Sequence, residues 1–348
     1  MPLDRRFLCI GPIWRGSNAG GIFRALSRIG CHLSVIDEFY YIPLHNKSTK
    51  TLFLSKIFRN WFIQEFNTAI LDEIKKFRPS ILFVYKGAFI LPETLREIKK
   101  KGIPCVNFYP DVSFHTHGQY LLQTLPIYNH IFTTKTFGIF DLDHQLGIKN
   151  VSFVPHGFDP EIHKKIEIMD PVFKSDVSFI GTWSLQKEKL IASLIRSLPD
   201  IIIKIWGSQW DRTTDEQLIS SNAIQRYPIT GDIYALAINN SRINLGLLSE
   251  KVRGASSGDK ITSRTFHIPG TNGFMLHERT DEISNYFVEG EEIACFEGED
   301  ELIEKVKYYL SEETERKSIK EKGYKRALND HSLDQRAQTI LNLLDEVL

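Results

Sequence analysis

The sequence predicts an α/β protein built of two doubly wound domains, and three observations support this class. The chain has 348 residues, enough for two domains of ordinary size. Short, continuous apolar runs alternate with segments of helical spacing, which is typical of parallel sheets covered on both faces. The alternation stops at a segment rich in Pro, His, Asp and Lys, residues 155–175, and then starts again. We interpret that segment as a linker and expect domains over 1–172 and 173–332, followed by a helix over 333–348 that can pack back on the first domain.

Strands and helices alternate through the first domain. The strands are the apolar runs 7–10, 33–36, 81–85, 106–109, 131–134 and 151–154. The helices are the segments 22–29, 52–77, 92–101 and 137–146. The longest helix ends where Arg78 precedes Pro79, because a residue before proline avoids the helical region. Pro92 fits the first turn of its helix, where its missing amide loses no hydrogen bond.

The same alternation predicts the second domain. The strands are the runs 177–180, 201–206, 243–247, 274–276 and 293–296. The helices are the segments 185–197, 282–287, 299–310, 312–330 and 333–348. Ligands of doubly wound sheets bind beyond the carboxyl ends of the strands, so we expect the site in a cleft between the two domains.

Charges balance over the whole chain but not along it. With 43 basic and 43 acidic residues, net charge gives no reason to expect nucleic acid as a partner. Residues 1–172 carry 21 Lys and Arg against 15 Asp and Glu, and the remainder carries 22 against 28. The basic first half favours an anionic partner there, and chance asymmetry is an equally good explanation.

Cysteine spacing and hydropathy indicate the compartment. Cys9, Cys31, Cys105 and Cys295 lie far apart and form no CxxC pair, so we expect buried thiols in a reducing environment and no zinc site. The first residues lack the apolar core of a signal peptide, and no apolar run is long enough to span a membrane. We therefore expect a cytoplasmic protein.

A glycine-rich loop, residues 11–21, follows the first predicted strand. Gly16 lets the backbone approach a ligand, and Ser17 precedes a helix whose amino terminus favours anions. The loop is neither GxGxxG nor a Walker motif, because Ser17 stands where the latter needs lysine. We expect Gly16 and Ser17 to line a substrate site, with an ordinary strand-to-helix turn as the alternative.

Two loops of the second domain also follow strands. Gly181 ends a strand, and Thr182 and Lys187 lie at the start of the next helix, where a helix dipole, amides, a hydroxyl and an ammonium group suit a pyrophosphate. The alternative is a capped helix with a solvated lysine. Gly207 follows another strand and leaves room for a ligand's ring, although by itself it is better explained as a plain turn.

The segment 256–282 is the most informative part of the chain. Thr262 can cap a short helix, and the amino terminus of that helix would present free amides. Lys260 and Arg264 flank this terminus, so the segment predicts an anion site. The candidate ligand-binding residues of this segment are Asp259, Lys260, Ser263, Arg264 and His267.

The same segment resembles the C-terminal domain of CgeB-type proteins, a branch of the group-one glycosyltransferases. The resemblance covers about residues 130–340 well and the first 130 weakly. Its specific part is the pattern Ser263-Arg264-x-Phe266-x-x-Pro269-x-x-x-Gly273-Phe-Met-Leu-x-Glu278-Arg279-Thr280, followed by Phe287-x-Glu289-Gly290-x-Glu292. Supporting matches are Val154-Pro-His-Gly157-x-Asp159, Phe179-x-Gly181, Gly323 and His331-Ser332.

This resemblance implies a GT-B fold, in which two Rossmann-like domains face one another. The second domain would hold most of the nucleotide diphosphate-sugar donor, and the first would hold the acceptor. The resemblance also implies no obligatory metal and no further cofactor, because a helix dipole and basic side chains would meet the phosphate charge.

One position departs from the wider group. Two acidic residues eight positions apart touch the donor sugar and the ribose there, and the matching positions are Asp259 and His267. A carboxylate can accept hydrogen bonds from both ribose hydroxyls, whereas a neutral imidazole accepts only one. His267 therefore implies that the ribose is held differently or that the activity is altered.

Three polar residues follow a strand of the first domain. Asp111, His115 and His117 occupy positions near which group members often place a histidine or an acid beside the reacting carbon. Asp111 and His117 are thus candidate catalytic residues that orient the acceptor or take its proton. A structural hydrogen-bonding role is an equally good alternative.

Residues 50–66 mix basic and aromatic side chains at helical spacing. They could form an interfacial helix that reaches a lipid-linked acceptor at the inner face of a membrane. A core helix with solvated Lys56 and Arg59 is the favoured alternative.

Residues and resemblance together predict a glycosyltransferase that moves a sugar from a nucleotide diphosphate donor to a glycan, lipid-linked glycan or protein. Retention of configuration is expected from the resemblance alone. One alternative is a GT-B protein that binds a nucleotide or sugar without turnover, and another is a sugar-nucleotide epimerase. The residues expected to meet the diphosphate are Thr182, Lys187, Lys260, Ser263 and Arg264.

Overall fold

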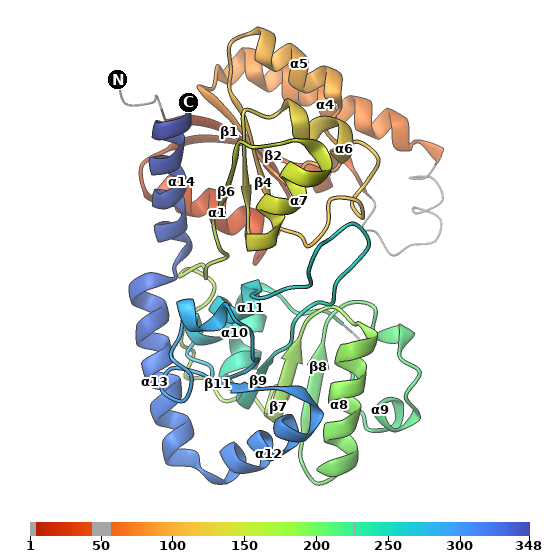
Figure 1. The fold of residues 1–348 in the computed structure, drawn as a ribbon, viewed down its shortest axis with the longest axis vertical. Coiled ribbons are helices and arrows are strands. Elements are labelled where there is room, and N and C mark those ends of the chain that lie inside the picture. Colours follow the sequence, from red (N-terminus) through yellow and green to blue (C-terminus); the bar gives the residue numbers. More distant parts are fainter. Residues whose placement is uncertain (1–4, 44–56, 226) are drawn as a thin grey trace. The chain divides into compact units, whose positions relative to one another are not determined.

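The computed structural model describes residues 5–43, 57–225 and 227–348. The chain divides into two compact units, each with its own hydrophobic core (Figure 1). The first unit comprises Met1–Pro155, Lys251–Ser257 and Arg336–Leu348. The second comprises His156–Glu250 and Gly258–Gln335. All four cysteines are free and buried, as expected. None of the helices in the described part of the chain combines the length and hydropathy that crossing a bilayer requires.

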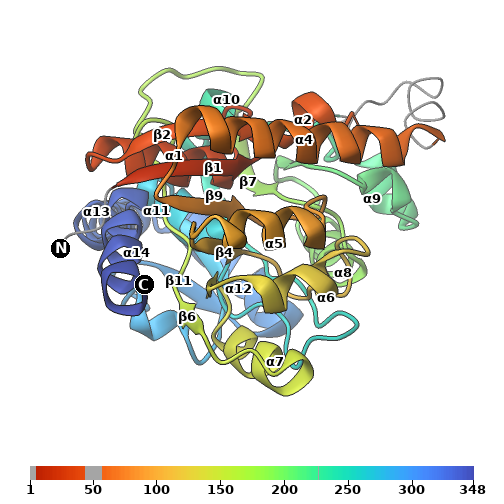
Figure 2. The same ribbon diagram turned by 90° about the horizontal axis from the view of Figure 1, so that it is seen from above.

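A parallel sheet forms the centre of the first unit. Within the described residues it has six strands in the order β2-β1-β3-β4-β5-β6. Figure 2 labels β2, β1, β4 and β6, which follow one another in this order. The strands are β1 (Arg6–Gly11), β2 (His32–Asp37), β3 (Ile81–Tyr85), β4 (Cys105–Tyr109), β5 (His130–Thr133) and β6 (Val151–Phe153). Both β3 and β4 are buried along their whole length, whereas the edge strand β2 is partly exposed. The six predicted strands of this half are therefore confirmed.

Helices of the first unit follow the predicted alternation. They are α1 (Asn18–Arg28), α2 (Glu38–Tyr41), α4 (Arg59–Phe77), α5 (Pro92–Lys100), α6 (Leu121–Thr124), α7 (Thr136–Leu146) and α14 (Leu333–Val347), with a 3₁₀ turn η1 (Leu125–Ile127). The expected helix 52–77 corresponds to α4, and its first residues, 52–56, lie outside the described residues. From Ile63 onward α4 buries an apolar stripe that also includes Phe66, Ile70 and Ile74.

A second parallel sheet forms the centre of the second unit. Among the described residues it has five strands in the order β11-β10-β9-β7-β8. The strands are β7 (Ser175–Ile180), β8 (Ile203–Trp206), β9 (Ser241–Gly246), β10 (Met275–Glu278) and β11 (Ala294–Phe296). Strand β8 pairs with one side of β7, and β9 pairs with the other side. The order in which strands are added to the sheet therefore reverses between β7 and β9. In doubly wound sheets such a switch point is where ligands bind.

Helices of the second unit include several that the sequence did not predict. The helices are α8 (Leu185–Ser197), α9 (Glu216–Ser220), α10 (Gly231–Asn239), α11 (Ser263–Gly270), α12 (Gly298–Ser311) and α13 (Glu313–Asp330), with 3₁₀ turns η2 (Trp210–Arg212) and η3 (Ile283–Asn285). The expected helix start at 282–287 is wrong, because only the single turn η3 forms there. Helix α10 was missed because its residues are apolar almost throughout and give no helical periodicity.

The expected linker packs as part of the second unit. Phe158 donates its amide to the backbone oxygen of His331 at 3.0 Å, and Leu333 donates back to Phe158 at 2.8 Å. The Asp170 amide donates to Oδ1 of Asn240 at 2.9 Å. These bonds place the boundary between the units after Pro155, upstream of the expected position at 172.

Residues 251–257 belong to the first unit although they lie between two elements of the second. Ser113 Oγ donates to the backbone oxygen of Arg253 at 2.7 Å. The amide of Ser256 donates to Oδ2 of Asp141 at 3.0 Å. This arrangement could not be predicted, because the loop carries no pattern of apolar side chains that would indicate where it packs.

Candidate functional site

The switch point of the second sheet places two loops side by side. Gly181 follows β7, and Leu247 follows β9, the neighbouring strand. The amide of Asp259 donates to the backbone oxygen of Ser249 at 2.8 Å, which ties the start of the 259–264 segment to the end of β9. Residues far apart in the sequence therefore meet at the carboxyl edge of this sheet.

Arg264 lies at this edge. It is in the first turn of α11, and its guanidinium group donates to the backbone oxygen of Leu247. The guanidinium carbon lies 5.2 Å from the centre of the Phe179 ring, in β7. Its Nε is buried and has no hydrogen-bond partner among the described residues. The side chain thus spans the ends of β7 and β9 with donor capacity that this unit does not use.

Lys187 is a second cation at the same edge, and its side chain is buried. Its Nζ lies 3.4 Å from the backbone oxygen of Thr182 and 3.3 Å from Oγ of Ser249. Burial and the nearby Arg264 lower the pKa of Lys187 to about 8, and the carboxylates of Glu250, Asp259 and Glu278 partly oppose this shift. A bound anion would offset both unfavourable effects, because it would supply the missing counter-charge.

Two glycines let the loops of this edge approach closely. A Cβ atom at Gly207 would lie 2.0 Å from the backbone oxygen of Gly181, and the φ of Gly207 is +149°. A Cβ atom at Gly181 would lie 2.9 Å from Nη1 of Arg264. Thr182 Oγ1 and Ser208 Oγ are 3.0 Å apart. The structure therefore brings Gly181, Thr182 and Gly207 together, next to the two cations.

Lys260 and Ser263 lie before and at the start of α11. Lys260 Nζ pairs with Oδ1 of Asp281 at 2.9 Å, and its backbone oxygen accepts from Oγ1 of Thr280 at 2.9 Å. Ser263 is the first residue of the helix and is half-buried. Neither side chain is shown in contact with Lys187 or Arg264, so their predicted roles at the diphosphate stay predictions.

His267 packs inside its own unit. Its ring stacks on that of His163 with centroids 3.8 Å apart, and the ring of Tyr234 lies edge-on at 6.0 Å. Burial, His163 and Arg264 hold the pKa of His267 well below its ordinary value, so the imidazole is neutral near pH 7. Its Nε2 is buried and has no hydrogen-bond partner among the described residues. Contact with a sugar or ribose stays a prediction for this residue and for Asp259.

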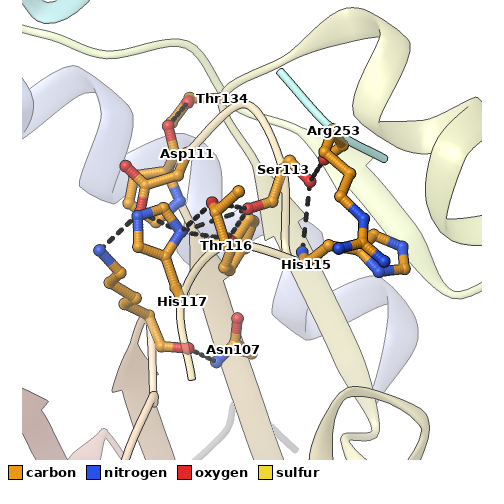
Figure 3. Close-up of polar contacts among 11 residues, drawn as sticks. Asn107, Asp111, Ser113, His115, Thr116, His117, Thr134 and Arg253 are labelled. Atoms are coloured by element: carbon orange, nitrogen blue, oxygen red, sulfur yellow. Dashed lines mark hydrogen bonds and ion pairs between the residues drawn. The ribbon is translucent and has the colours of Figure 1, made fainter. Parts of the chain in front are cut away.

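Asp111 follows β4 in the first unit and forms an ion pair that the sequence did not predict. Lys86, which follows β3, places its Nζ 2.9 Å from Oδ2 of Asp111. Lys86 has a φ of +66°, and Asn107 Nδ2 donates to its backbone oxygen at 3.1 Å (Figure 3). Burial alone would raise the pKa of Asp111, but Lys86 and His117 outweigh it and lower the pKa. Asp111 is therefore an ionised carboxylate rather than a proton donor.

The hydrogen bonds of His117 fix its neutral tautomer. Nδ1 lies 3.2 Å from the backbone oxygen of Ser113 and 3.0 Å from the hydroxyl of Tyr109, which itself donates to Ser113 at 2.8 Å (Figure 3). A carbonyl oxygen only accepts, so Nδ1 carries the hydrogen and Nε2 keeps its lone pair. Burial lowers the pKa of His117, and Asp111 only partly opposes this effect. Nε2 can thus accept a proton from a hydroxyl group.

Glu38 is a further candidate that the sequence analysis missed. It begins α2, directly after β2, and only 6% of it is exposed. Burial raises its pKa to about 7, against the opposing effect of Lys86. The signal available in the sequence was an acidic pair, Asp37 and Glu38, at the end of a predicted strand. Glu38, Lys86 and Asp111 all follow strands of one sheet, so a mixed-charge set lies at its carboxyl edge.

The loop that carries His115 and His117 is anchored by residues 251–257. His115 Nε2 lies 2.8 Å from Oε1 of Gln145, whose Nε2 donates to the backbone oxygen of Gly254 at 2.8 Å. A Cβ atom at Gly254 would lie 2.3 Å from the His115 ring. Figure 3 shows Arg253 beside His115. His115 therefore serves packing and anchoring.

Ser17 caps α1. Its Oγ accepts from the amide of Gly20 at 3.0 Å and donates to the backbone oxygen of Pro12 at 2.7 Å. Gly16 precedes it with a φ of +91°. The tight turn thus accounts for the hydroxyl of Ser17, and a substrate contact of Gly16 or Ser17 stays a prediction.

The chain is similar to known proteins in part of its sequence and in its fold. Residues 186–342 match the family model described as glycosyl transferase-like. No curated protein matches the sequence significantly. The fold is similar to that of a glycosyltransferase from Rickettsia africae ESF-5, with a TM-score of 0.64, 12% identity, and coverage of 99% of this chain and 98% of that one.

Two further solved structures are similar over nearly their whole length. Sucrose-phosphate synthase from Thermosynechococcus elongatus has a TM-score of 0.65 at 10% identity and covers 98% of this chain and 99% of its own. Anabaena HepE, solved in complex with UDP and glucose, has a TM-score of 0.60 at 10% identity and covers 98% of this chain and 100% of its own. The chain has the GT-B fold, and its residues 186–342 match the glycosyl transferase-like model.

Proposed function

We propose that this protein is a glycosyltransferase that takes a sugar from a nucleotide diphosphate donor held by the second unit. The observation that carries the proposal is the pair of cations at the switch point of the second sheet, the buried Lys187 and the half-buried Arg264. Both lie within the segment that matches the glycosyl transferase-like model. The nearby carboxylates only partly offset the effects of burial and of Arg264 on Lys187, and a diphosphate would supply further negative charge.

The proposed chemistry is stabilisation of the departing diphosphate. Negative charge builds on the phosphate that leaves the sugar, and preorganised cations and amides at that point lower the barrier. Lys187 and Arg264 would meet this charge together with the amino terminus of α11. The CgeB-type subtype, independence from metal and retention of configuration belong to this proposal and rest on the sequence resemblance.

The acceptor would bind to the first unit. Nε2 of His117 can accept a proton or a hydrogen bond from a hydroxyl group. The carboxylate of Asp111, paired with Lys86, lies beside this imidazole. A hydroxyl of a glycan, a lipid-linked glycan or a protein fits this chemistry. HepE of Anabaena binds UDP and glucose, which favours a uridine nucleotide as the first donor to test here.

The test is release of free nucleoside diphosphate from UDP-, GDP-, TDP- and ADP-sugars by the purified full chain. We expect slow release from one donor in the absence of acceptor, and its loss in Lys187→Met and Arg264→Met. Lys322→Met and Arg196→Met are matched controls, because both side chains are exposed and form ion pairs in the same unit. Release that is equal in all four variants would contradict the proposal.

A non-catalytic nucleotide-binding protein is the second candidate function. The observation that favours it is the neutral His267 stacked on His163, at a position where the resemblance expects a carboxylate. Tight binding of a nucleotide sugar without release of diphosphate, with every donor tried, would select this candidate over the transferase.

A further inference from the structure

Lys86 has a strained backbone conformation at the carboxyl edge of the first sheet. It directly follows β3, and its φ is +66°, in the left-handed region that residues with a Cβ atom rarely adopt. Its amide donates to the backbone oxygen of Phe108 at 2.8 Å, and its own backbone oxygen accepts from Nδ2 of Asn107 at 3.1 Å. Both partners belong to β4, so the neighbouring strand fixes this conformation. Glycine would relieve the strain, and strained positions that carry a side chain cluster at functional sites.

The side chain of Lys86 forms an ion pair with Asp111. Nζ lies 2.9 Å from Oδ2 of Asp111, and the same Oδ2 lies 3.6 Å from Nδ1 of His117 (Figure 3). All three side chains are partly exposed, and all three residues belong to the first unit. One carboxylate oxygen therefore stands between an ammonium group and an imidazole.

The charges of this set act on His117 in opposite directions. Burial lowers the pKa of His117, Asp111 raises it, and Lys86 lowers it again. A carboxylate this close to a histidine favours the imidazolium form, in which both ring nitrogens carry a hydrogen and neither can accept one. Lys86 already supplies a positive charge to Asp111, so the imidazole does not have to supply it.

We propose that Lys86 is a positioning residue for the acceptor hydroxyl: its ammonium group neutralises Asp111, so that His117 stays uncharged and its Nε2 stays free to receive the hydroxyl hydrogen. The inference rests on the proposed function, because that function assigns His117 to the acceptor. Lys86 acts through the carboxylate and the imidazole rather than by contact with the acceptor. The role also accounts for a lysine in a backbone conformation that favours glycine.

Other titratable groups of the first unit, among the described residues, bear on the same set. The hydroxyl of Tyr109, in β4, lies 3.0 Å from Nδ1 of the imidazole. Burial raises the pKa of Asp111, and Lys135, directly before α7, helps Lys86 to outweigh that effect. Burial also raises the pKa of Glu38 to about 7, and the ammonium group of Lys86 opposes this rise. Because Glu38 titrates in the same range as a histidine, the experiment must include a variant without it.

Titration of His117 by NMR tests the inference in the full chain without substrate. Histidines labelled with carbon-13 report each imidazole, and the signal that His117→Gln loses is the one to follow. We expect Lys86→Met to raise the pKa of His117, because Asp111 has then lost its ion-pair partner. Lys86→Arg restores the charge and should bring the pKa back towards that of the wild type. The same comparison in the Glu38→Gln background should give the same rise.

Two further variants separate the charge of Lys86 from its effect on folding. Lys86→Gly removes the ammonium group and also relieves the left-handed strain, so it should unfold at a higher temperature than Lys86→Met and still raise the pKa of His117. Lys75→Met is the matched control, because it removes an exposed lysine of the same unit that pairs with Asp72 at 2.9 Å. It should leave the pKa of His117 unchanged. An unchanged pKa in folded Lys86→Met, or an equal rise in Lys75→Met, would overturn the inference.

Failure of the inference and failure of the proposed function give different results. Diphosphate release by the wild type with an unmoved pKa of His117 in Lys86→Met would contradict the inference alone. A moved pKa without diphosphate release from any donor would contradict the proposed function alone. In an active transferase, the acid limb of the pH–rate profile should move to higher pH in Lys86→Met. A limb that stays in place although the pKa has moved would overturn the role of Lys86 at the acceptor.

Discussion

Lys187 and Arg264 are the residues whose environment demands an explanation. Lys187 is buried and Arg264 is half-buried, and desolvation lowers the pKa of both. Their types and positions could be predicted from the sequence, because each stands beside a helix start that follows a glycine or a capping residue. That the two side chains lie close together could not be predicted, because 77 positions separate residues 187 and 264. Only the strand order of the sheet brings them together. Glu38 and Lys86 were missed for the same reason.

Replacement of Arg264 should weaken nucleotide binding. We expect Arg264→Ala to cost about 1–3 kcal/mol in the binding of UDP, through loss of a charge-assisted hydrogen bond. Calorimetric titration measures the change. Arg196→Ala, which removes an exposed arginine of the same unit, should leave the affinity as it is. An unchanged affinity for Arg264→Ala would remove Arg264 from the phosphate site.

The affinity for a diphosphate should depend on pH through Lys187. Its pKa in the free protein is about 8, and a bound anion would raise it. Below pH 8 the amine is already charged, so affinity should be nearly constant there. Above pH 8 binding must take up a proton, so affinity should fall as pH rises. Calorimetry in buffers of different ionisation enthalpy at pH 8.5 detects that uptake, and Lys187→Met should abolish it.

Glu38 should destabilise the folded chain at neutral pH and above. Its pKa is raised by burial from 4.5 to about 7, so the folded state loses stability as pH rises from about 4.5 towards 7. We expect Glu38→Gln to increase the free energy of unfolding at pH 8 by roughly 1–3 kcal/mol, with a smaller gain at pH 5. Urea unfolding at both pH values measures this. A loss of stability at pH 8 would mean that the carboxylate is well compensated.

Elements of regular structure were predictable wherever their apolar pattern was clear. Every predicted strand is present, because a strand buried on both faces reads as a continuous apolar run. Helix α10 and the packing of residues 156–174 were not predictable, since neither has a period of its own and both depend on partners elsewhere in the second unit. The turns after β7 and β8 could be located in the sequence from Gly181 and Gly207. The contact between the two turns could not be predicted.

The turn after β8 should tolerate no side chain. Gly207→Ala would place Cβ 2.0 Å from the backbone oxygen of Gly181, which also accepts a hydrogen bond from Nε1 of Trp210 at 2.9 Å. We expect a loss of about 2–4 kcal/mol in unfolding free energy, with loss of nucleotide binding. Gly290→Ala is the matched control: its φ is +81°, yet no atom lies within 4 Å of the added Cβ. It should cost only about 1 kcal/mol. Equal effects would contradict the close approach.

At the scale of the whole molecule, two parallel sheets each present candidate residues at a carboxyl edge. The second carries paired cations suited to a diphosphate, and the first carries a neutral histidine and a carboxylate suited to a hydroxyl. The alternation of strands and helices in each half predicted two doubly wound parts, and the resemblance of residues 263–292 implied the GT-B fold. Neither predicted that residues 251–257 pack with the first unit, because that depends on hydrogen bonds to Ser113 and Asp141.

A crystal structure of the full chain soaked with UDP tests the central claim most directly. The account predicts both phosphates at the carboxyl edge of the second sheet, with Lys187 Nζ and the Arg264 guanidinium group within hydrogen-bonding distance of their oxygens. Density for the nucleotide at any other place, with Lys187 and Arg264 still bonded only to groups of their own unit, would contradict it.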